Sequence, residues 1–360
     1  MQFGYSEVCL AHDPGPRHPE TPDRLRAIRE RLKRKHGVEY VEADPVGFDD
    51  IASVHDRSYV EDVEEFCAEG GGNWDPDTTA VEETWDAIRY SAGQATWAIE
   101  QALEGNTGRE TPFSIGRPPG HHAVVDDAMG FCFVNNVAVA AQQALEDDAY
   151  DVDRVAIVDW DVHHGNGTQD IFYDREDVFF VSIHEKGLYP GTGQIDESGE
   201  GDGERTTMNL PMPAGTDDVD YLAAVEGPIA TALEAYDPDL LIVSAGFDAH
   251  RHDPISRIRL STEAYALLTD RLRGLADRTD AALAFVLEGG YGLDVLADSV
   301  SIVHETFDGR EPIEPDDDEE VSDDAASVIA DVADEHGLEV DVGAVGEAGD
   351  DSHGDDDLEG

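Results

Sequence analysis

An apolar run in this sequence leads directly into side chains that could bind a metal. Residues 155–158 are apolar, and Asp159, Asp161 and His163 follow them. A buried strand that ends in carboxylates and imidazoles is unfavourable unless these groups are paired or bound to a metal. In an extended chain Asp161 and His163 project from the same face, because they lie two positions apart. They offer oxygen and nitrogen ligands to a divalent ion, so the run predicts a metallohydrolase.

Polar clusters also follow four other predicted strands. In an open parallel sheet, binding and catalytic sites form at the carboxyl ends of the strands. Five clusters after five strands are therefore expected to lie along one edge of the sheet and to assemble a single site. The strands are predicted at Thr111–Gly116, Arg154–Asp159, Val178–His184, Leu240–Ala245 and Leu283–Glu288, and the clusters at 117–122, 159–164, 182–184, 244–250 and 288–291.

The elements that must position these clusters alternate along the chain. Short apolar runs are separated by segments of helical periodicity, which is typical of a parallel sheet covered by helices on both faces. This pattern predicts an α/β fold. A sixth strand is predicted at Glu7–His12, and helices at Pro22–His36, Glu82–Leu103, Asn135–Leu145, Asp218–Ala235, Thr262–Asp277 and Leu293–Phe307.

Helix caps and long loops complete this outline. Ser261 is expected to cap the fifth predicted helix, and Thr79 or Asp77 to open the second. Two long loops lie at Ala68–Thr79 and Glu185–Thr207. Loops of this length in a compact domain are usually functional or mobile.

The charge of the chain is extreme. Its 360 residues include 82 acidic and 23 basic residues, giving a net charge of −59, and the acidic residues are spread along the whole length. Self-repulsion at this charge destabilises a compact fold at low ionic strength, whereas molar salt screens it over a Debye length of about 3 Å. We therefore expect a protein adapted to a cytosol of very high salt. Direct nucleic-acid binding is not expected, because it requires clusters of Lys and Arg.

The cysteines and the hydropathy pattern bear on location. Three cysteines, none in a CxxC pair, make a disulfide framework improbable and are interpreted as small buried hydrophobes. No stretch of 18 apolar residues is present, and residues 1–20 lack a basic start and an apolar core. The expected location is cytoplasmic, without membrane contact.

The composition changes near residue 310. Residues 1–310 are expected to form one catalytic domain. No Lys or Arg follows Arg310, and acidic runs interrupt the remainder. We expect residues 311–360 to be an acidic, largely flexible tail, with a short helix around Ala325–Ala333.

Seven motifs give the chain a resemblance to the histone deacetylase superfamily, which includes protein deacetylases, acetylpolyamine amidohydrolases and acetoin-utilisation proteins. The resemblance covers about residues 1–310 and implies an arginase/deacetylase-like three-layer αβα sandwich with a central, mostly parallel sheet. It also implies hydrolysis of an N-acetyl amide with one bound zinc ion. The motifs are HPETPDRL (18–25), RPPGHHA (117–123), GFCFVNN (130–136), DWDVHHGNG (159–167), YPGTG (189–193), SAGFDAH (244–250) and EGGY (288–291).

The resemblance implies a ligand set for the metal. Asp161, His163 and Asp248 match the metal ligands of the family and leave at least one position for water and substrate. Zn²⁺ follows mainly from the resemblance, because two carboxylates and one imidazole also suit Fe²⁺ or Mn²⁺. The neighbouring His164 and His250 are interpreted as structural.

The resemblance also implies catalytic roles. His122 is expected to deprotonate the metal-activated water and later to protonate the leaving amine, with His121 as its electrostatic partner. Asp159 is expected to hold His121 and Asn166 to hold His122, and Asn166 places the chain nearer the branch that includes class II deacetylases. Tyr291, after two glycines, is expected to donate a hydrogen bond to the acetyl oxygen.

The substrate is expected to enter a narrow apolar channel. Phe131, beside Gly130, and Tyr189 match the family's two aromatic walls, which would flank a methylene chain such as that of acetyl-lysine. Ile255 lies at a rim position where an acidic residue would favour polyamines, so an apolar residue there weakens the polyamine interpretation. Asp77 is a candidate for the aspartate that grips substrate amides, although a helix N-cap explains it almost as well.

The remaining expectations concern supporting groups and partners. Ser182, with the backbone around Asp159, resembles the family's monovalent-cation site, where we expect a structural K⁺. Arg24 and Arg117 are expected to serve internal pairing or product exit. N-acetylated proteins and small-molecule amines both fit as substrates, and the sequence does not predict an oligomeric state.

Two alternatives to the deacetylase interpretation stay open. A dinuclear manganese ureohydrolase on the related fold would need further Asp and His ligands, and this chain offers Tyr291 instead. A catalytically silent module that binds acetyl-lysine would have no use for the paired imidazoles of His121 and His122. Metal content distinguishes the ureohydrolase from the deacetylase, because about one ion per chain favours the deacetylase and about two ions favour the ureohydrolase.

Overall fold

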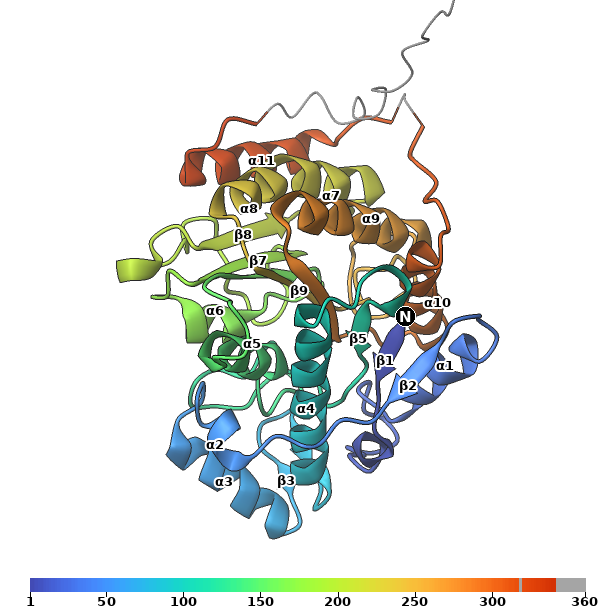
Figure 1. The fold of residues 1–360 in the computed structure, drawn as a ribbon, viewed down its shortest axis with the longest axis vertical. Helices are drawn as coiled ribbons and strands as arrows, with labels where there is room; N and C mark the ends of the chain where they lie inside the picture. The colour runs from blue at the N-terminus through green and yellow to red at the C-terminus, as the bar shows by residue number, and fades with distance from the viewer. Residues whose placement is uncertain (317–318, 341–360) are drawn as a thin grey trace, which may run out of the picture.

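A parallel sheet forms the centre of the computed structural model, which describes residues 1–316 and 319–340. Its eight strands lie in the order β2-β1-β5-β10-β9-β6-β7-β8, and each neighbouring pair is parallel (Figure 1). A small antiparallel hairpin, β3 (Gly72–Asn73) and β4 (Thr79–Ala80), stands apart from it. The strands of the main sheet are β1 (Gln2–Gly4), β2 (Glu39–Val41), β5 (Pro112–Ser114), β6 (Val155–Asp159), β7 (Val178–Glu185), β8 (Thr207–Met212), β9 (Leu240–Ala245) and β10 (Ala282–Leu287).

Helices cover both faces of the sheet, so the expected three-layer αβα sandwich is confirmed. Alternate residues of β6 supply opposite cores: Ala156 and Val158 join one hydrophobic cluster, and Val155 and Ile157 join the other. The first cluster includes α1 (Asp23–Leu32), α7 (Asp218–Ala224), α8 (Ala230–Tyr236), α9 (Thr262–Thr279), α10 (Leu293–Phe307) and α11 (Asp323–His336), and the second includes α2 (Phe48–Ile51), α3 (Arg57–Ala68), α4 (Thr84–Leu103), α5 (Asn136–Glu146) and α6 (Asn166–Phe172).

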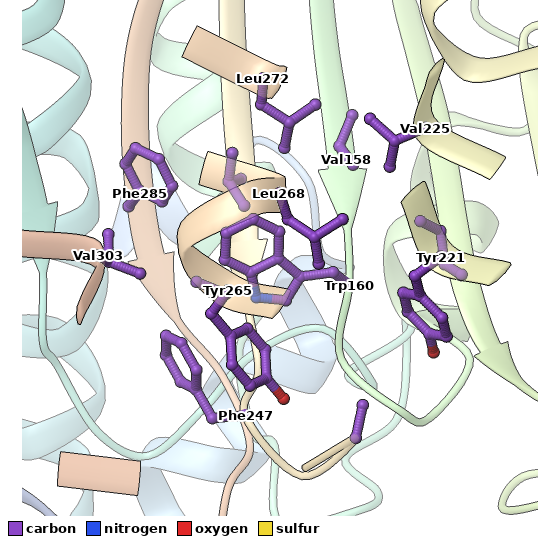
Figure 2. Packing of buried hydrophobic residues seen from close by; sticks show 14 of the residues in the cluster. Val158, Trp160, Tyr221, Val225, Phe247, Tyr265, Leu268, Leu272, Phe285 and Val303 are labelled. Atoms are coloured by element: carbon purple, nitrogen blue, oxygen red, sulfur yellow. The ribbon is translucent and has the colours of Figure 1, made fainter. Parts of the chain in front are cut away.

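Aromatic packing fixes the ends of two central strands. Trp160 follows β6 and Phe247 follows β9, and both side chains are fully buried against Tyr265 of α9 (Figure 2). Because Trp160 and Phe247 point into the core, the backbone directs the next residues, Asp161 and Asp248, away from it. Burial of large aromatic side chains is strongly stabilising, so the packing behind the site holds both carboxylates in place.

Two sequence predictions about local structure are wrong. The strand expected at Glu7–His12 is a short 3₁₀ helix over Glu7–Leu10, because the Ser6 hydroxyl accepts a hydrogen bond from the Val8 amide and starts a turn. Neither Thr79 nor Asp77 opens the second predicted helix. That helix, α4, has Glu83 at its N-cap position without a side-chain hydrogen bond.

Other boundaries agree closely with the prediction. Ser261 caps α9 by accepting a hydrogen bond from the Ala264 amide, as expected. The helix expected over Asp218–Ala235 forms but is interrupted by a π-helical turn at Val225–Ile229, which contains Pro228. The two edge strands β2 and β8, the strand β1 and the helices α2, α3 and α6 were not predicted.

Part of the predicted tail is folded. The helix expected around Ala325–Ala333 extends over Asp323–His336, and its apolar residues Ile329 and Val332 are buried in the core cluster. Residues 323–336 therefore form a helix that packs beside β8. The prediction for residues 317–318 and 341–360 lies outside the described residues.

Two smaller expectations concern the cysteines and the membrane. Cys9, Cys67 and Cys132 are buried as free thiols, as expected. Among the residues described here, no helix is long and apolar enough to cross a membrane.

Candidate active site and its metal centre

Three predicted metal ligands meet beyond the ends of β6 and β9. Ligand atoms of Asp161, His163 and Asp248 all lie within 4.8 Å of one another, and all three residues are buried. Nδ1 of His163 is 2.9 Å from Oδ1 of Asp161 and 3.2 Å from Oδ2 of Asp248. β6 ends at Asp159, so Asp161 and His163 lie in the following loop instead of in the strand. Their spacing still brings them together.

The hydrogen bonds of this cluster leave room for a cation. Backbone amides orient the carboxylates: Val162 donates to Oδ1 of Asp248, and Gly289 donates to Oδ2 of Asp161. Oδ2 of Asp248 is buried and accepts no hydrogen bond, although Nδ1 of His163 lies 3.2 Å away. Two buried carboxylates beside one imidazole need a positive charge, and their oxygen and nitrogen atoms suit a divalent metal. The residues present therefore fit the metal that the fold family implies.

The two adjacent imidazoles have different partners. Nδ1 of His121 is 2.8 Å from Oδ2 of Asp159, and Nδ1 of His122 is 2.8 Å from Oδ1 of Asn166. Their rings are 4.0 Å apart between centroids. The structure thus brings together both predicted pairs, beside the metal cluster, since Nε2 of His121 is 3.9 Å from Asp161.

Their surroundings separate the two histidines electrostatically. Burial by itself lowers the pKa of His121, but the carboxylates of Asp159 and Asp161 outweigh it and raise the pKa to about 10. Burial, together with repulsion from His121 and His163, holds the pKa of His122 well below its usual value. A charged His121 beside a neutral His122 is the division that an electrostatic partner and a general base require.

Tyr291 lies in a backbone segment, residues 288–292, that is held from several sides. The guanidinium of Arg24 donates to the carbonyls of Glu288 and Gly290, at 2.5 and 2.7 Å, and lies 5.2 Å from the Tyr291 ring centroid. Desolvation raises the pKa of Tyr291 well above its usual value. The phenol therefore keeps its proton and can donate a hydrogen bond.

The two predicted channel walls each contact a catalytic candidate. Tyr189 packs edge-on against His122 at 5.1 Å, and Phe131 packs edge-on against Tyr291 at 5.7 Å. Gly130 lies between His122 and Tyr189: with φ +55°, a Cβ on it would come within 2.3 Å of the His122 ring. Only glycine fits this position without displacing the imidazole.

Phe131 is held in an unusual conformation by residues that the sequence did not reveal. Its φ is +70°, which is rare for a bulky residue. Its amide donates to the Thr78 hydroxyl at 3.2 Å, and its ring packs against His18 at 4.6 Å. His18 in turn contacts the carbonyl of Asp77 at 2.8 Å. The hairpin β3–β4 thus supports the wall formed by Phe131.

The predicted rim residues are placed less directly. Asp77 lies in this hairpin, partly buried and close to Asp75, whose carboxylate accepts a hydrogen bond from the Asp77 amide. Burial, followed by Asp75, raises the pKa of Asp77. Ile255 is linked to Tyr291 by the carboxylate of Asp253, which accepts hydrogen bonds from the backbone amides of both residues. Contact between Asp77 or Ile255 and a substrate stays a prediction.

Ser182, the residue predicted to line a monovalent-cation site, lies next to Asp159 in the sheet. It is fully buried on β7 and pairs in register with Asp159 of β6, and its hydroxyl is 3.0 Å from Nδ1 of His184. Nδ1 of His164 is 2.8 Å from the Thr192 hydroxyl and its Nε2 is 2.9 Å from Oε1 of Gln169, so both ring nitrogens have partners outside the metal cluster. A bound K⁺ stays a prediction.

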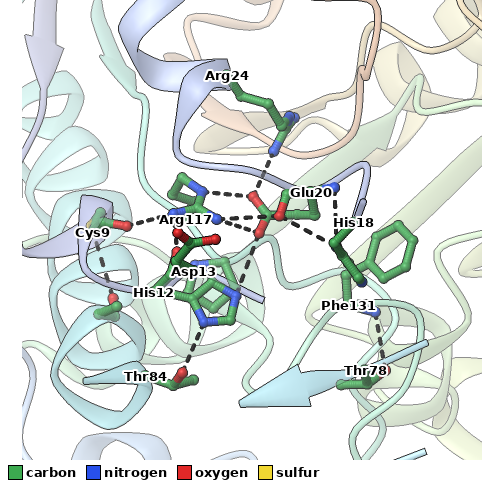
Figure 3. Close-up of polar contacts among 12 residues, drawn as sticks. Cys9, His12, Asp13, His18, Glu20, Arg24, Thr78, Thr84, Arg117 and Phe131 are labelled. Atoms are coloured by element: carbon green, nitrogen blue, oxygen red, sulfur yellow. Dashed lines mark hydrogen bonds and ion pairs between the residues drawn. The ribbon is translucent and has the colours of Figure 1, made fainter. Parts of the chain in front are cut away.

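A buried charge network supports the site from behind. Arg117 makes a two-bond contact with Glu20, at 2.7 and 2.5 Å, and Glu20 also contacts Arg24 and His12 (Figure 3). All of these side chains are buried. The expected internal pairing of Arg24 and Arg117 is confirmed, and their shared partner Glu20 links the segment before His121 to the segment that carries Tyr291.

A separate cavity of about 670 Å³ lies between α4, α5 and residues 42–46. None of the predicted site residues lines it. It has no evident connection with the metal cluster.

The comparisons with known proteins agree with this geometry. Residues 18–307 match the family model described as the histone deacetylase domain. The chain is 40% identical over 297 residues to a probable deacetylase of Methanothermobacter thermautotrophicus, covering 82% of this chain and 87% of the relative. It is 39% identical over 316 residues to "Histone deacetylase 10, chloroplastic" of Oryza sativa, covering 81% and 70%.

A bacterial relative and a solved structure extend the agreement. The chain is 35% identical over 312 residues to "Histone deacetylase-like amidohydrolase" of Pseudomonas aeruginosa, covering 80% of this chain and 81% of the relative. The crystal structure of the HDA15 HD domain aligns with a TM-score of 0.83 at 33% identity, covering 93% of this chain and 96% of that one. The matched family domain spans the metal cluster, the histidine pair and Tyr291, and this chain belongs to the histone deacetylase family of hydrolases.

Proposed function

We propose that this protein is a metal-dependent deacetylase that removes acetyl groups from N-acetylated lysine or amine substrates by means of an activated water. The observation that carries the proposal is the convergence of a buried Asp161–His163–Asp248 cluster with two differently partnered imidazoles. We assign Zn²⁺ to this cluster, with Fe²⁺ and Mn²⁺ as alternatives.

The chain's own residues divide the chemistry. When bound, the metal lowers the pKa of the attacking water and polarises the acetyl carbonyl. Oδ1 of Asn166 accepts from Nδ1 of His122, so Nε2 of His122 is the basic nitrogen. This nitrogen takes the proton from the attacking water and later returns it to the leaving amine.

His121 and Tyr291 stabilise the negative charge that develops on the substrate and do not carry the proton of the attacking water. Asp159 keeps His121 protonated, so its charge stabilises the negative charge that develops as water attacks. The Tyr291 hydroxyl donates a hydrogen bond to the acetyl oxygen. Phe131 and Tyr189 flank the methylene chain of the substrate and exclude water from it. Asp77 and Ile255 lie at the mouth, and K⁺ binds near Ser182.

The alternatives have less support. A dinuclear ureohydrolase needs more Asp and His ligands, and the described residues contain one cluster of three or more ligating side chains. A silent binding module has no need of a neutral imidazole held beside a charged one.

The test is turnover of acetyl-lysine peptides, acetylputrescine and acetylated amino acids in molar KCl with Zn²⁺. Tyr291→Phe and His122→Gln should each lower kcat by about 10²–10⁴-fold while about one metal ion per chain stays bound. Tyr150→Phe, a change in a tyrosine that lines the separate cavity, is the control. Unchanged turnover in the two variants would refute the assigned roles, and full activity in dilute buffer would refute the high-salt adaptation.

A further inference from the structure

Among the carboxylates of residues 1–316 and 319–340, Asp253 alone binds the backbone of Tyr291. Its Oδ2 accepts hydrogen bonds from the amides of Tyr291 and Gly292, at 2.7 and 2.9 Å. Its Oδ1 accepts from the amide of Ile255 at 3.0 Å. The side chain is buried, with 7% of its surface exposed. Three charge-assisted hydrogen bonds to one buried carboxylate are a strong constraint on the backbone that donates them.

The rest of the 288–292 segment is held by other groups. Its carbonyls at Glu288 and Gly290 accept from Arg24, and its Gly289 amide donates to Asp161. The carbonyl of Gly289 accepts from the Phe247 amide at 3.1 Å. Arg24, Phe247 and Asp161 therefore fix the segment up to Gly290, and Asp253 alone binds the amides of the two residues that follow.

This division matters because Gly290 has no Cβ, so its backbone has access to more conformations than that of any other residue type. Its φ of +116° lies in a region that only glycine enters readily, and it directly precedes Tyr291. A glycine at this position leaves the direction of the Tyr291 side chain open unless the backbone that follows is held by hydrogen bonds. The amides of Tyr291 and Gly292 provide these hydrogen bonds, and both donate to Oδ2 of Asp253.

We propose that Asp253 is a positioning residue that holds the Tyr291 hydroxyl in its reactive place. Asp253 acts through Tyr291 and has no contact with the reacting atoms. By also binding the Ile255 amide, it couples the position of Tyr291 to the rim on that side. The proposal rests on the role assigned to Tyr291 under the proposed function.

A double-mutant cycle tests it. Asp253→Asn retains the shape of the side chain but replaces one acceptor oxygen with an NH₂ group. Whichever way this amide is turned, its NH₂ group faces either the Ile255 amide or the amides of Tyr291 and Gly292, so the three hydrogen bonds cannot all form. In the otherwise native chain, it should lower kcat for an acetyl-lysine peptide by about 10- to 100-fold, with KM changed less than about threefold. In the Tyr291→Phe background, the same change should lower kcat by less than about twofold.

The matched control is Asp294→Asn. Asp294 is exposed and lies three residues from Tyr291, so its substitution removes the same charge nearby without removing hydrogen bonds from the segment. Its kcat should stay within about twofold of the native value. A second readout uses 3-fluorotyrosine at position 291: Asp253→Asn should broaden or split its ¹⁹F resonance, and Asp294→Asn should leave it unchanged.

The outcomes separate the two claims. An equal loss of kcat in both backgrounds, no loss in either, or an unchanged ¹⁹F resonance would overturn the role of Asp253. Asp253→Ser, which leaves one hydroxyl acceptor, is measured in the same cycle. If Asp253→Asn and Asp253→Ser both lose the bound metal or fail to fold, the proposal is also overturned, because Asp253 would then support the whole site. If Tyr291→Phe alone leaves kcat unchanged, the proposed function fails instead.

Discussion

The proposed metal ligands lie on short segments that follow buried strands, whereas the predicted substrate contacts lie on loops held by a few hydrogen bonds. Asp161 is two residues beyond the end of β6, and Asp248 is three residues beyond β9. Phe131, by contrast, depends on the Thr78 hydroxyl and the His18 ring, and Tyr189 belongs to the long loop after β7. We call the cluster of Asp161, His163 and Asp248 the metal end of the site, and Phe131 and Tyr189 its mouth. The metal end is therefore held rigidly by the sheet, and the mouth is not. Changes at the two ends should have different kinetic consequences.

The largest effect is expected at the metal end. Asp248→Ala should abolish metal binding and lower kcat by at least about a thousandfold, because the remaining two ligands cannot hold the ion. Metal analysis of the purified variant, together with an assay of an acetyl-lysine peptide, checks this. Asp151→Asn, at an exposed position, is the control and should keep its metal. A variant that keeps one ion and native turnover would remove Asp248 from the ligand set.

The next largest effect is expected in the buried network of Glu20, Arg24 and Arg117. Glu20→Gln leaves Arg117 and Arg24 buried without their shared carboxylate, so the free energy of unfolding should fall by about 3–5 kcal/mol. Denaturant unfolding in molar KCl measures it. Glu30→Gln removes an exposed carboxylate that pairs with Lys33 and should leave the unfolding midpoint nearly unchanged. Equal effects in the two variants would mean that the buried network adds no special stability.

An acid-sensitive contact is expected at His55, which holds the segments around Val124 and Asn135. His55 contacts the Val124 carbonyl and accepts from the Asn135 amide, and burial lowers its pKa to about 4. The unfolded chain takes up this proton near pH 6.5, whereas the folded chain resists protonation until about pH 4. His55 therefore stabilises the fold above pH 6.5, and this contribution of about 3 kcal/mol is lost as the pH falls toward 4.

The measurement is the free energy of unfolding between pH 4 and 7 in molar KCl. His55→Gln should flatten the pH dependence relative to the native chain, and His36→Gln, at an exposed histidine, should not. A native chain whose stability is constant over this range would contradict the assignment. Parallel curves for the native chain and His55→Gln would do the same.

The smallest effect is expected at the mouth itself. Tyr189→Ala removes a ring that is 36% exposed and packs on His122, so KM for an acetyl-lysine peptide should rise about tenfold while kcat changes less than about threefold. Steady-state kinetics separates the two constants. Tyr189→Phe keeps the ring and should behave like the native chain. A large fall in kcat with an unchanged KM would mean that Tyr189 acts in the chemical step and not in substrate binding.

The same contrast explains what the sequence could predict. Asp161, His163 and Asp248 follow short apolar runs that were predicted as strands, so the meeting of their segments at one edge of the sheet follows from topology. The choice of Asp248 as the third ligand, by contrast, depended on the family resemblance. The pairs His121–Asp159 and His122–Asn166 depended on the family resemblance, and the structure places both.

Residues that act through backbone hydrogen bonds escaped prediction. Asp253, Thr78 and His18 hold amides or carbonyls of distant segments, and no local pattern encodes such a partner. The buried face of α11 was underestimated because its acidic composition conceals the apolar positions Ala325, Ile329 and Val332, whose spacing is that of one helix face. β1 is only three residues long, too short for a periodic signal.

The most direct measurement is a metal titration. The chain is stripped of metal with a chelator and then titrated with Zn²⁺, Mn²⁺ or Fe²⁺ in molar KCl, while bound metal and hydrolysis of an acetyl-lysine peptide are followed together. A site built from Asp161, His163 and Asp248 predicts that both signals saturate at one ion per chain. Saturation at two ions, or hydrolysis that persists in the stripped chain, would contradict it.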